Sequence, residues 1–243
     1  MTVAVGVGMI LSVAAPAAAQ DISINLGQNG GSNGLTERVI QLIAFVTVLS
    51  LAPSILIMMT SFTRIVVVLS LLRTALGTAT APPNAVIIAL AMFLTAFVMG
   101  PALQTAYDAG VRPLVNNEIT VEQAFDRSSA PLKTFMQRNV RPKDLALFSD
   151  LSREPEPATP EEMSLRILVP AFMISELKRA FEIGFLLFLP FLIIDLVVAS
   201  VLMSMGMMML PPVVVSLPFK LIFFVLVDGW SLVAGSLIQS YGT

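Results

Sequence analysis

The sequence predicts an all-α integral membrane protein, on three observations. Hydrophobic residues make up 56% of the 243 residues and charged residues only 12%, roughly half of the charged share of an average soluble domain. The uncharged runs 39–63 and 85–107 are each long enough for a helix to cross a bilayer. A third apolar stretch, 181–227, predicts two more helices at about 180–206 and 211–238. We expect lipid or partner subunits to cover this much apolar surface.

Composition also excludes several kinds of chemistry. The chain has no Cys and no His, which removes disulfides, thiol catalysis, a His general base and an ordinary zinc site. A net charge of −2 gives no reason to expect nucleic acid as a partner. No Gly-x-Ser-x-Gly and no Walker motif occurs. We therefore expect no enzymatic activity, no metal and no other cofactor.

The first 38 residues are expected to lie outside the main fold. Residues 1–19 are small and apolar, and the pattern Ala17-x-Ala19 predicts a signal peptide that is cleaved before Gln20. An uncleaved anchor is the alternative. Residues 20–38 are rich in Gly, Asn and Ser, which predicts a flexible segment.

Three further segments are expected after this point. Residues 39–106 form a first hydrophobic hairpin, and residues 167–243 form a second one with a Met-rich turn. Between them, residues 107–166 hold eight of the 14 Lys and Arg and ten of the 16 Asp and Glu. Apolar spacing over 132–148 predicts a helix in this polar insert, and the Pro-rich stretch 154–160 predicts a linker. The insert is too small and too polar for a large core of its own, so we expect a helical cap on the membrane part.

The charge pattern predicts how the chain is oriented. Arg64 and Arg73 follow the first apolar run, and no acidic residue lies between Thr63 and Asn84. Positive residues favour the cytoplasmic side. A cleaved signal peptide places the N-terminus on the other side, in agreement. We expect an inner-membrane protein whose N-terminus and residues 107–166 are periplasmic.

Each predicted hairpin carries a Pro-Pro pair at its break. Pro82 and Pro83 end the first apolar helix, and Pro211 and Pro212 follow the Met-rich turn. Proline ends helices because it lacks an N–H and fixes φ. A weak internal duplication, as in many transport proteins, is one explanation, and coincidence is the other.

Some charges in the second apolar region can pair locally. Glu176 and Arg179 are three residues apart, and Lys178 and Glu182 are four apart, which are the spacings that bring side chains together on a helix.

Other charges have no neighbour in the sequence. Asp195 and Lys220 need partners on another helix or another subunit, because charges within a membrane are paired or line a wet path. Arg64 and Arg73 are expected to be buried as well. A proton relay is the alternative, but the chain has no His and few carboxylates to build one.

Consecutive methionines occupy the turn of the second hairpin. Met207, Met208 and Met209 cannot all face one core from a regular helix, because neighbours point about 100° apart. Met is flexible and fills irregular gaps, so several copies around an axis would make a deformable apolar ring that excludes ions by dewetting. Simple space filling is the alternative.

Two other functions stay open at this point. A small-solute or ion transporter would use Asp195 and Lys220 as a site near the middle of the membrane. An intramembrane protease would use the Ser-x-x-Lys pattern of Ser175 and Lys178. We reject a penicillin-binding type of site, because this short pattern often arises by chance and its companion motifs are absent.

Longer stretches are specific enough to indicate a family. They are MTSFTRIVVVLSLLRTALG at 59–77, PPN at 82–84, LALF at 145–148, VPAFMISELK at 169–178, FEIGFLLF at 181–188, LIIDLVVASVLMSMGM at 192–207 and SLPFKL at 216–221, with DGW at 228–230. Together they resemble the FliP family of flagellar export-gate proteins, over about residues 39–232. The related injectisome SctR proteins share many of them, but the signal peptide and residues 73–77 look more flagellar.

The resemblance implies a role in type III protein export. Such proteins are expected to assemble, here in five copies, with FliQ and FliR into a helical cone at the inner membrane of the flagellar basal body. FlhA and FlhB would be further partners in the export apparatus. Unfolded flagellar subunits would pass through the centre of the cone. Partner helices rather than lipid would then cover much of the apolar surface.

The resemblance also implies roles for single residues. Met207, Met208 and Met209 would line the closed pore as a gasket. Glu176 and Lys220 would form a salt bridge between neighbouring copies. Phe135 and Phe148 would make assembly contacts in the periplasmic helices.

Overall fold

The computed structural model describes residues 32–78, 80–152, 163–207 and 209–242. These residues form helices joined by turns, and no strand occurs among them. The prediction of an all-α fold is confirmed. The expected signal peptide 1–19, most of the segment 20–38, the linker 154–160 and Met208 lie outside the described residues.

The chain divides between Thr47 and Val48 into two compact units. Helix α1 (Ser32–Met58) passes through this boundary. In the first unit, residues 39–47 form exposed helix, and α1 includes the last residues of the segment that was expected to be flexible. All remaining helices belong to the second unit.

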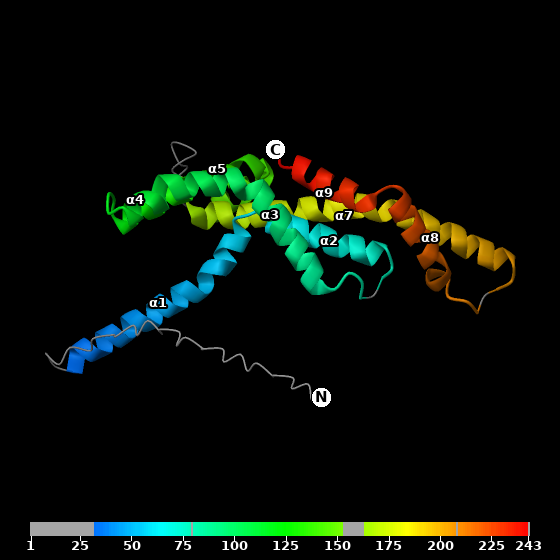
Figure 1. The fold of residues 1–243 in the computed structure, drawn as a ribbon, viewed down its shortest axis with the longest axis horizontal. Coiled ribbons are helices and arrows are strands. Elements are labelled where there is room, and N and C mark those ends of the chain that lie inside the picture. Colours follow the sequence, from blue (N-terminus) through cyan, green and yellow to red (C-terminus); the bar gives the residue numbers. More distant parts are fainter. Residues whose placement is uncertain (1–31, 79, 153–162, 208, 243) are drawn as a thin grey trace, which may run out of the picture. The chain divides into compact units, whose positions relative to one another are not determined.

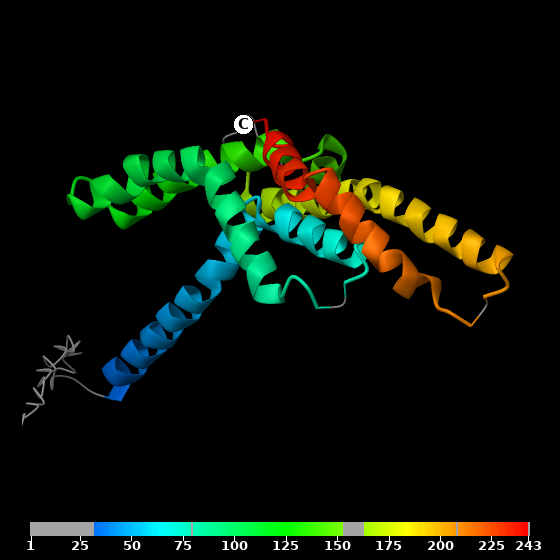
Figure 2. The ribbon, with the colours of Figure 1, turned by 45° about the vertical axis from the view of Figure 1, so that its right-hand side comes forward.

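Helix α7 (Leu165–Ser204) is the element on which the second unit is built. Helices α2 (Phe62–Ala75), α5 (Val121–Asn139), α6 (Pro142–Ser152) and α8 (Pro212–Leu226) all pack against it. Figures 1 and 2 both show α2 and α5 running alongside α7. The prediction placed the start of this helix near residue 180, but the helix begins at Leu165 and has 40 residues.

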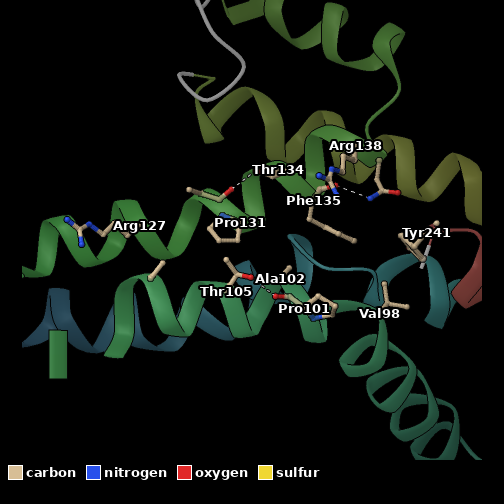
Figure 3. Close-up of a pocket in the computed structure, with 14 residues that line it drawn as sticks. Val98, Pro101, Ala102, Thr105, Arg127, Pro131, Thr134, Phe135, Arg138 and Tyr241 are labelled. Atoms are coloured by element: carbon tan, nitrogen blue, oxygen red, sulfur yellow. Dashed lines mark hydrogen bonds between the residues drawn. The ribbon is translucent and has the colours of Figure 1, made fainter. Parts of the chain in front are cut away.

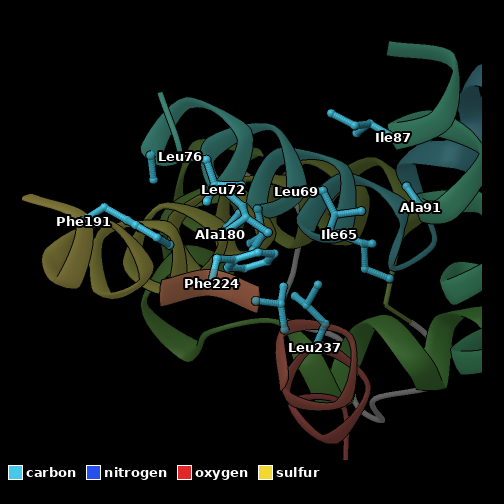
Figure 4. Packing of buried hydrophobic residues seen from close by; sticks show 13 residues of the cluster. Ile65, Leu69, Leu72, Leu76, Ile87, Ala91, Ala180, Phe191, Phe224 and Leu237 are labelled. Atoms are coloured by element: carbon cyan, nitrogen blue, oxygen red, sulfur yellow. The ribbon is translucent and has the colours of Figure 1, made fainter. Parts of the chain in front are cut away.

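The larger core lies where α2 meets α7, α8 and α9 (Gly229–Gln239), as Figure 4 shows. The face of α2 that points inward carries Ile65, Leu69 and Leu72 at helical spacing, all essentially inaccessible. Each such side chain stabilises the fold by roughly 1.5–3 kcal/mol when it is fully buried. Further members of this core are Val68, Ala75, Leu76, Ile87, Ala91, Ala180, Phe191, Phe224, Val233 and Leu237.

A glycine lets α2 and α7 approach closely. A Cβ atom at Gly184 would lie 2.3 Å from the Cδ1 atom of Leu71 and 3.2 Å from its Cβ atom. An alanine at this position of α7 would therefore require the Leu71 side chain to move.

The polar insert begins within a helical segment that continues from α3. Helix α3 (Asn84–Ala106) runs without interruption through a π-helical turn, η1 (Tyr107–Val111), into α4 (Arg112–Val115). Helix α5 begins with a capping box in which Thr120 and Gln123 exchange side-chain hydrogen bonds with each other's backbone N–H groups. A second core joins these helices to α7 through Met99, Leu132, Met136, Leu168 and Phe172.

Two predicted helices are each divided into two. The stretch 132–148 is broken between α5 and α6, because Val140 is extended and Arg141 precedes Pro142, a position that disfavours the helical conformation. The stretch 211–238 is broken at Asp228, which has a φ of 51° and a ψ of 50°. Helices α8 and α9 are bent there by 62°.

Two of the described helical segments are long and apolar enough to cross a membrane. They are 84–115 and α7, and the bent pair of α8 and α9 makes a third if it counts as one span. The structure is thus that of an all-α protein with membrane-type helices.

Candidate functional site

The Met-rich turn begins at a regular helix end. The N–H of Gly206 donates to the carbonyl of Met203 at 3.1 Å, and the N–H of Met207 donates to that of Leu202 at 3.0 Å. Gly206 has a φ of 73°. This is the Schellman arrangement, in which glycine takes the left-handed position after the helix. It fixes where the chain leaves α7, so the residues that follow are presented at the tip of the hairpin.

The side chains at this tip are apolar and uncovered within the chain. Met209 is 98% exposed, and Met203, Met205 and Met207 are 59%, 66% and 41% exposed. Pro211 is the N-cap of α8 and Pro212 is its first residue, a position where proline is favoured. A tip of this composition, exposed in one chain, needs lipid or another chain to cover it.

Lys220 and Asp195 are partners of each other. The Nζ atom of Lys220 lies 2.6 Å from Oδ2 of Asp195 and 3.2 Å from the carbonyl oxygen of Ala75. The hydroxyl of Ser216 donates to the other carboxylate oxygen of Asp195. Ala75 is the last residue of α2, where the helix dipole favours a cation. The sequence left open whether the partners of Lys220 and Asp195 lie on another helix or on another subunit. Within the chain, each is the partner of the other, on neighbouring helices α8 and α7.

Arg64 and Glu176 form a second buried ion pair. The Nε atom of Arg64 donates to Oε2 of Glu176 at 2.9 Å, and its Nη2 atom donates to Oε1. The side chains are only 1% and 0% exposed. The expected local pairing of Glu176 with Arg179 is therefore replaced by a two-pronged bond to α2, which suits the planar guanidinium. The local pair of Lys178 and Glu182 is present, at 3.8 Å and on the surface.

Residues after α9 complete this second pair. The hydroxyl of Tyr241 donates to Oε2 of Glu176, and the guanidinium carbon of Arg64 lies 3.8 Å from the centre of the Tyr241 ring. The Oγ atom of Ser240 accepts from Nη1 of Arg64 at 2.9 Å. Burial, and next the charge of Glu176, raise the pKa of the Tyr241 phenol above its ordinary value, so the phenol stays a donor. No local pattern in the sequence pointed to Tyr241.

The two phenylalanines expected at assembly contacts lie on the second core. Phe135 packs edge-on against Phe172, with ring centres 6.0 Å apart, and stacks on Tyr241 at 5.8 Å. Phe148 is partly buried against the same core. Both keep some exposed surface.

Arg73 joins the end of α2 to the Pro-Pro turn. Its Nη1 atom donates to the carbonyl of Pro82 at 3.3 Å and to the side-chain oxygen of Asn84. Pro83 is the N-cap of α3. Arg64 is fully buried as expected, whereas Arg73 and Asp195 are only partly buried within one chain.

The hydroxyl of Ser175 connects α7 to the start of α6. It donates to Oδ2 of Asp144 at 2.6 Å and accepts from the backbone N–H of Arg141 at 3.0 Å. The bond from the Arg141 side chain, aided by Ser175, lowers the pKa of Asp144 despite its burial. Lys178 lies on the surface with Glu182. Ser175 and Lys178 therefore have separate partners, and within the described residues no group of side chains could hold a metal ion.

A groove of about 740 Å³ opens between α3 and α5. Figure 3 shows Arg127 toward one end and Tyr241 toward the other, with Pro131 of α5 and Pro101 of α3 between them. The groove thus ends beside the buried pair of Arg64 and Glu176.

Comparisons with known proteins identify the family of the chain. The FliP family model matches residues 45–237. The flagellar biosynthetic protein FliP of Caulobacter vibrioides is 61% identical over 241 residues, which cover 99% of this chain and 90% of that protein. The proteins of the same name from Pectobacterium carotovorum and Bacillus subtilis are 55% and 54% identical, over 88% and 83% of this chain and 82% and 91% of theirs. The chain belongs to the FliP family.

Proposed function

We propose that this chain is a core pore-forming subunit of the flagellar type III export gate and conducts unfolded flagellar proteins across the inner membrane. Its relatives are named flagellar biosynthetic proteins, which supports a flagellar role. The main support for a pore is the hairpin tip, where methionine side chains lie exposed at the end of two apolar helices. A ring of such tips from several copies would close the pore as a soft apolar gasket.

The apolar flanks of the hairpin support assembly. Leu192, Ile193 and Leu196 on α7 and Val214 and Phe219 on α8 are all at least 40% exposed. An apolar groove of about 480 Å³ lies between these helices and is lined by Val, Ile, Leu and Phe side chains. Such a surface suits a helix of another subunit. In our proposal the occupants are further copies of this chain, five in all, together with FliQ and FliR.

The pairing of Glu176 with Lys220 of a neighbouring copy belongs to this proposal. In the single chain Glu176 is bound to Arg64 and Tyr241, and Lys220 is bound to Asp195 and Ala75. Because both residues are almost fully buried, the pairing between copies would exchange or add partners rather than satisfy free charges. Phe135 and Phe148 would contribute contacts between periplasmic helices.

The proposal also assigns a location to each segment of the chain. The N-terminus and residues 107–166 would face the periplasm, after removal of residues 1–19. The hairpins 39–106 and 167–243 would form the wall of a helical cone in the basal body, and FlhA and FlhB would contact it from the export apparatus.

The test is the ion permeability of a gate that lacks the gasket. We expect deletion of Met207, Met208 and Met209 to leave the complex with FliQ and FliR intact in native mass spectrometry. The same deletion should make liposomes that contain the complex leaky to small ions. Replacement of all three residues by leucine is the matched control, because it keeps the apolar bulk and should keep the pore closed. Unchanged conductance in the deletion would exclude the gasket.

A further inference from the structure

Tyr241 contacts two residues that the proposed function places between copies. Its hydroxyl donates to Glu176, and its ring stacks on Phe135 at 5.8 Å and lies over Arg64 at 3.8 Å. Tyr241 lies beyond residues 45–237, which the family model matches. One aromatic side chain therefore covers both residues in the single chain.

Glu176 accepts three hydrogen bonds within the chain, and its covering groups limit access to it. A carboxylate offers about four acceptor sites. Arg64 uses Oε1 through Nη2 and Oε2 through Nε, and Tyr241 also donates to Oε2. Glu176 is 0% exposed, so a donor from another chain reaches it only after a covering group has moved away. A lysine ammonium would then take the position of the phenol.

Tyr241 is the covering group that lies beside open space. Arg64 projects from the first turn of α2, which packs against α7, whereas Tyr241 follows the end of α9 in a turn that continues to Gly242, whose φ is 71°. The groove of about 740 Å³ begins directly beside the Tyr241 ring, with Val98 and Phe135 nearby (Figure 3). A ring displaced into this space would not require α9 to unfold.

We propose that Tyr241 is a latch that occupies Glu176 and Phe135 in the unassembled chain and is displaced by a second copy of the chain during assembly. This inference rests on the proposed function, in which Glu176 meets Lys220 of a neighbour. The exchange replaces an O–H donor by an N–H donor on the same carboxylate. Glu176 thus keeps its number of hydrogen bonds, and the latch sets how readily copies associate.

Tyr241→Phe tests whether the Tyr241 hydroxyl competes with a second copy for Glu176, because this substitution removes the hydroxyl and keeps the ring. The readout is the apparent dissociation constant of the complex with FliQ and FliR, measured by titration and native mass spectrometry. We expect Tyr241→Phe to lower this constant by roughly tenfold, the size of one hydrogen bond to a charged group. Tyr107→Phe is the matched control, since Tyr107 is the only other tyrosine and is exposed. An unchanged or raised constant for Tyr241→Phe overturns the latch.

A second measurement needs no variant. Tetranitromethane nitrates accessible phenols, and peptide mass spectrometry reports each tyrosine separately. In the unassembled chain we expect Tyr107 to react at least about tenfold faster than Tyr241, whose hydroxyl is held by Glu176. Equal rates overturn the latch but leave the proposed function in place. A wild-type chain that forms no complex at all overturns both.

Discussion

The ammonium of Lys220 lies 2.6 Å from the carboxylate of Asp195, between the two helices of the Met-tipped hairpin. The pair joins α8 to α7, and the bond from Lys220 to Ala75 joins both to the end of α2. The same contacts connect the hairpin to α2, which belongs to the larger core. The pair therefore has a role within the chain whether or not Lys220 also meets a neighbour.

A charge exchange separates these two roles of Lys220. Lys220→Glu alone should destabilise the chain by about 3–5 kcal/mol, because it leaves Asp195 facing a like charge in a mostly buried site. Adding Asp195→Lys restores an opposite pair and should recover most of the melting temperature in detergent. If Lys220 also binds Glu176 of another copy, the double variant folds but still assembles poorly with FliQ and FliR. Full recovery of assembly would show that Lys220 acts only within the chain and does not bind Glu176 of another copy.

A methyl group at Gly184 should destabilise the crossing of α2 and α7. Gly184→Ala places a Cβ atom 2.3 Å from Leu71 at the crossing of α2 and α7, and overpacking of this kind costs about 1–3 kcal/mol. Gly235→Ala is the matched control, because Gly235 also lies within a helix and a Cβ atom added there would meet nothing within 4 Å. There the substitution should be neutral or stabilise α9 by up to about 1 kcal/mol. Thermal unfolding of both variants in detergent checks the pair, and equal melting temperatures would contradict the close approach.

Asp144 should stabilise the junction of α5, α6 and α7 in a pH-dependent way. Its pKa is lowered in the folded chain by Arg141 and Ser175, so its contribution is complete above the ordinary Asp value of about 3.9. The contribution is lost as the pH falls below that value through the folded pKa. Asp144→Asn should therefore lower stability at pH 7 by about 1.5–3 kcal/mol, the range for a hydrogen bond to a charged group. The difference from wild type should shrink near pH 3. A difference that stays constant from pH 7 to pH 3 would show that the charge of Asp144 is not involved.

Much of the fold follows from patterns that act over a few residues. The apolar runs predict the helices, and the Pro-Pro pairs mark both turns, because these properties depend on neighbours in the chain. The break at Asp228 was missed although Asp-Gly is a common turn pair. The division at Arg141 was missed in the same way, although Pro142 follows it. In both places the apolar spacing continues across the break and conceals it.

The candidate site was less predictable because its contacts join distant parts of the chain. Arg64 and Glu176 are separated by 112 residues, and Tyr241 lies 65 residues beyond Glu176. Local spacing suggested Arg179 as the partner of Glu176, and only the packing of α2 on α7 replaces it with Arg64. The exposure of the Met tip is likewise a property of the packed hairpin, although its composition was evident in the sequence.

The most direct test of the gate is whether the hairpin tips of different copies meet. The chain has no Cys, so Met209→Cys introduces a single thiol at a position that is 98% exposed. In the assembled complex, mild oxidation should join copies into disulfide-linked dimers, whereas Phe93→Cys, an exposed position on α3 outside the tip, should give few. Dimers at Met209→Cys that require assembly with FliQ and FliR are the predicted result. An intact complex in which Met209→Cys stays monomeric under oxidation would contradict a shared methionine gasket.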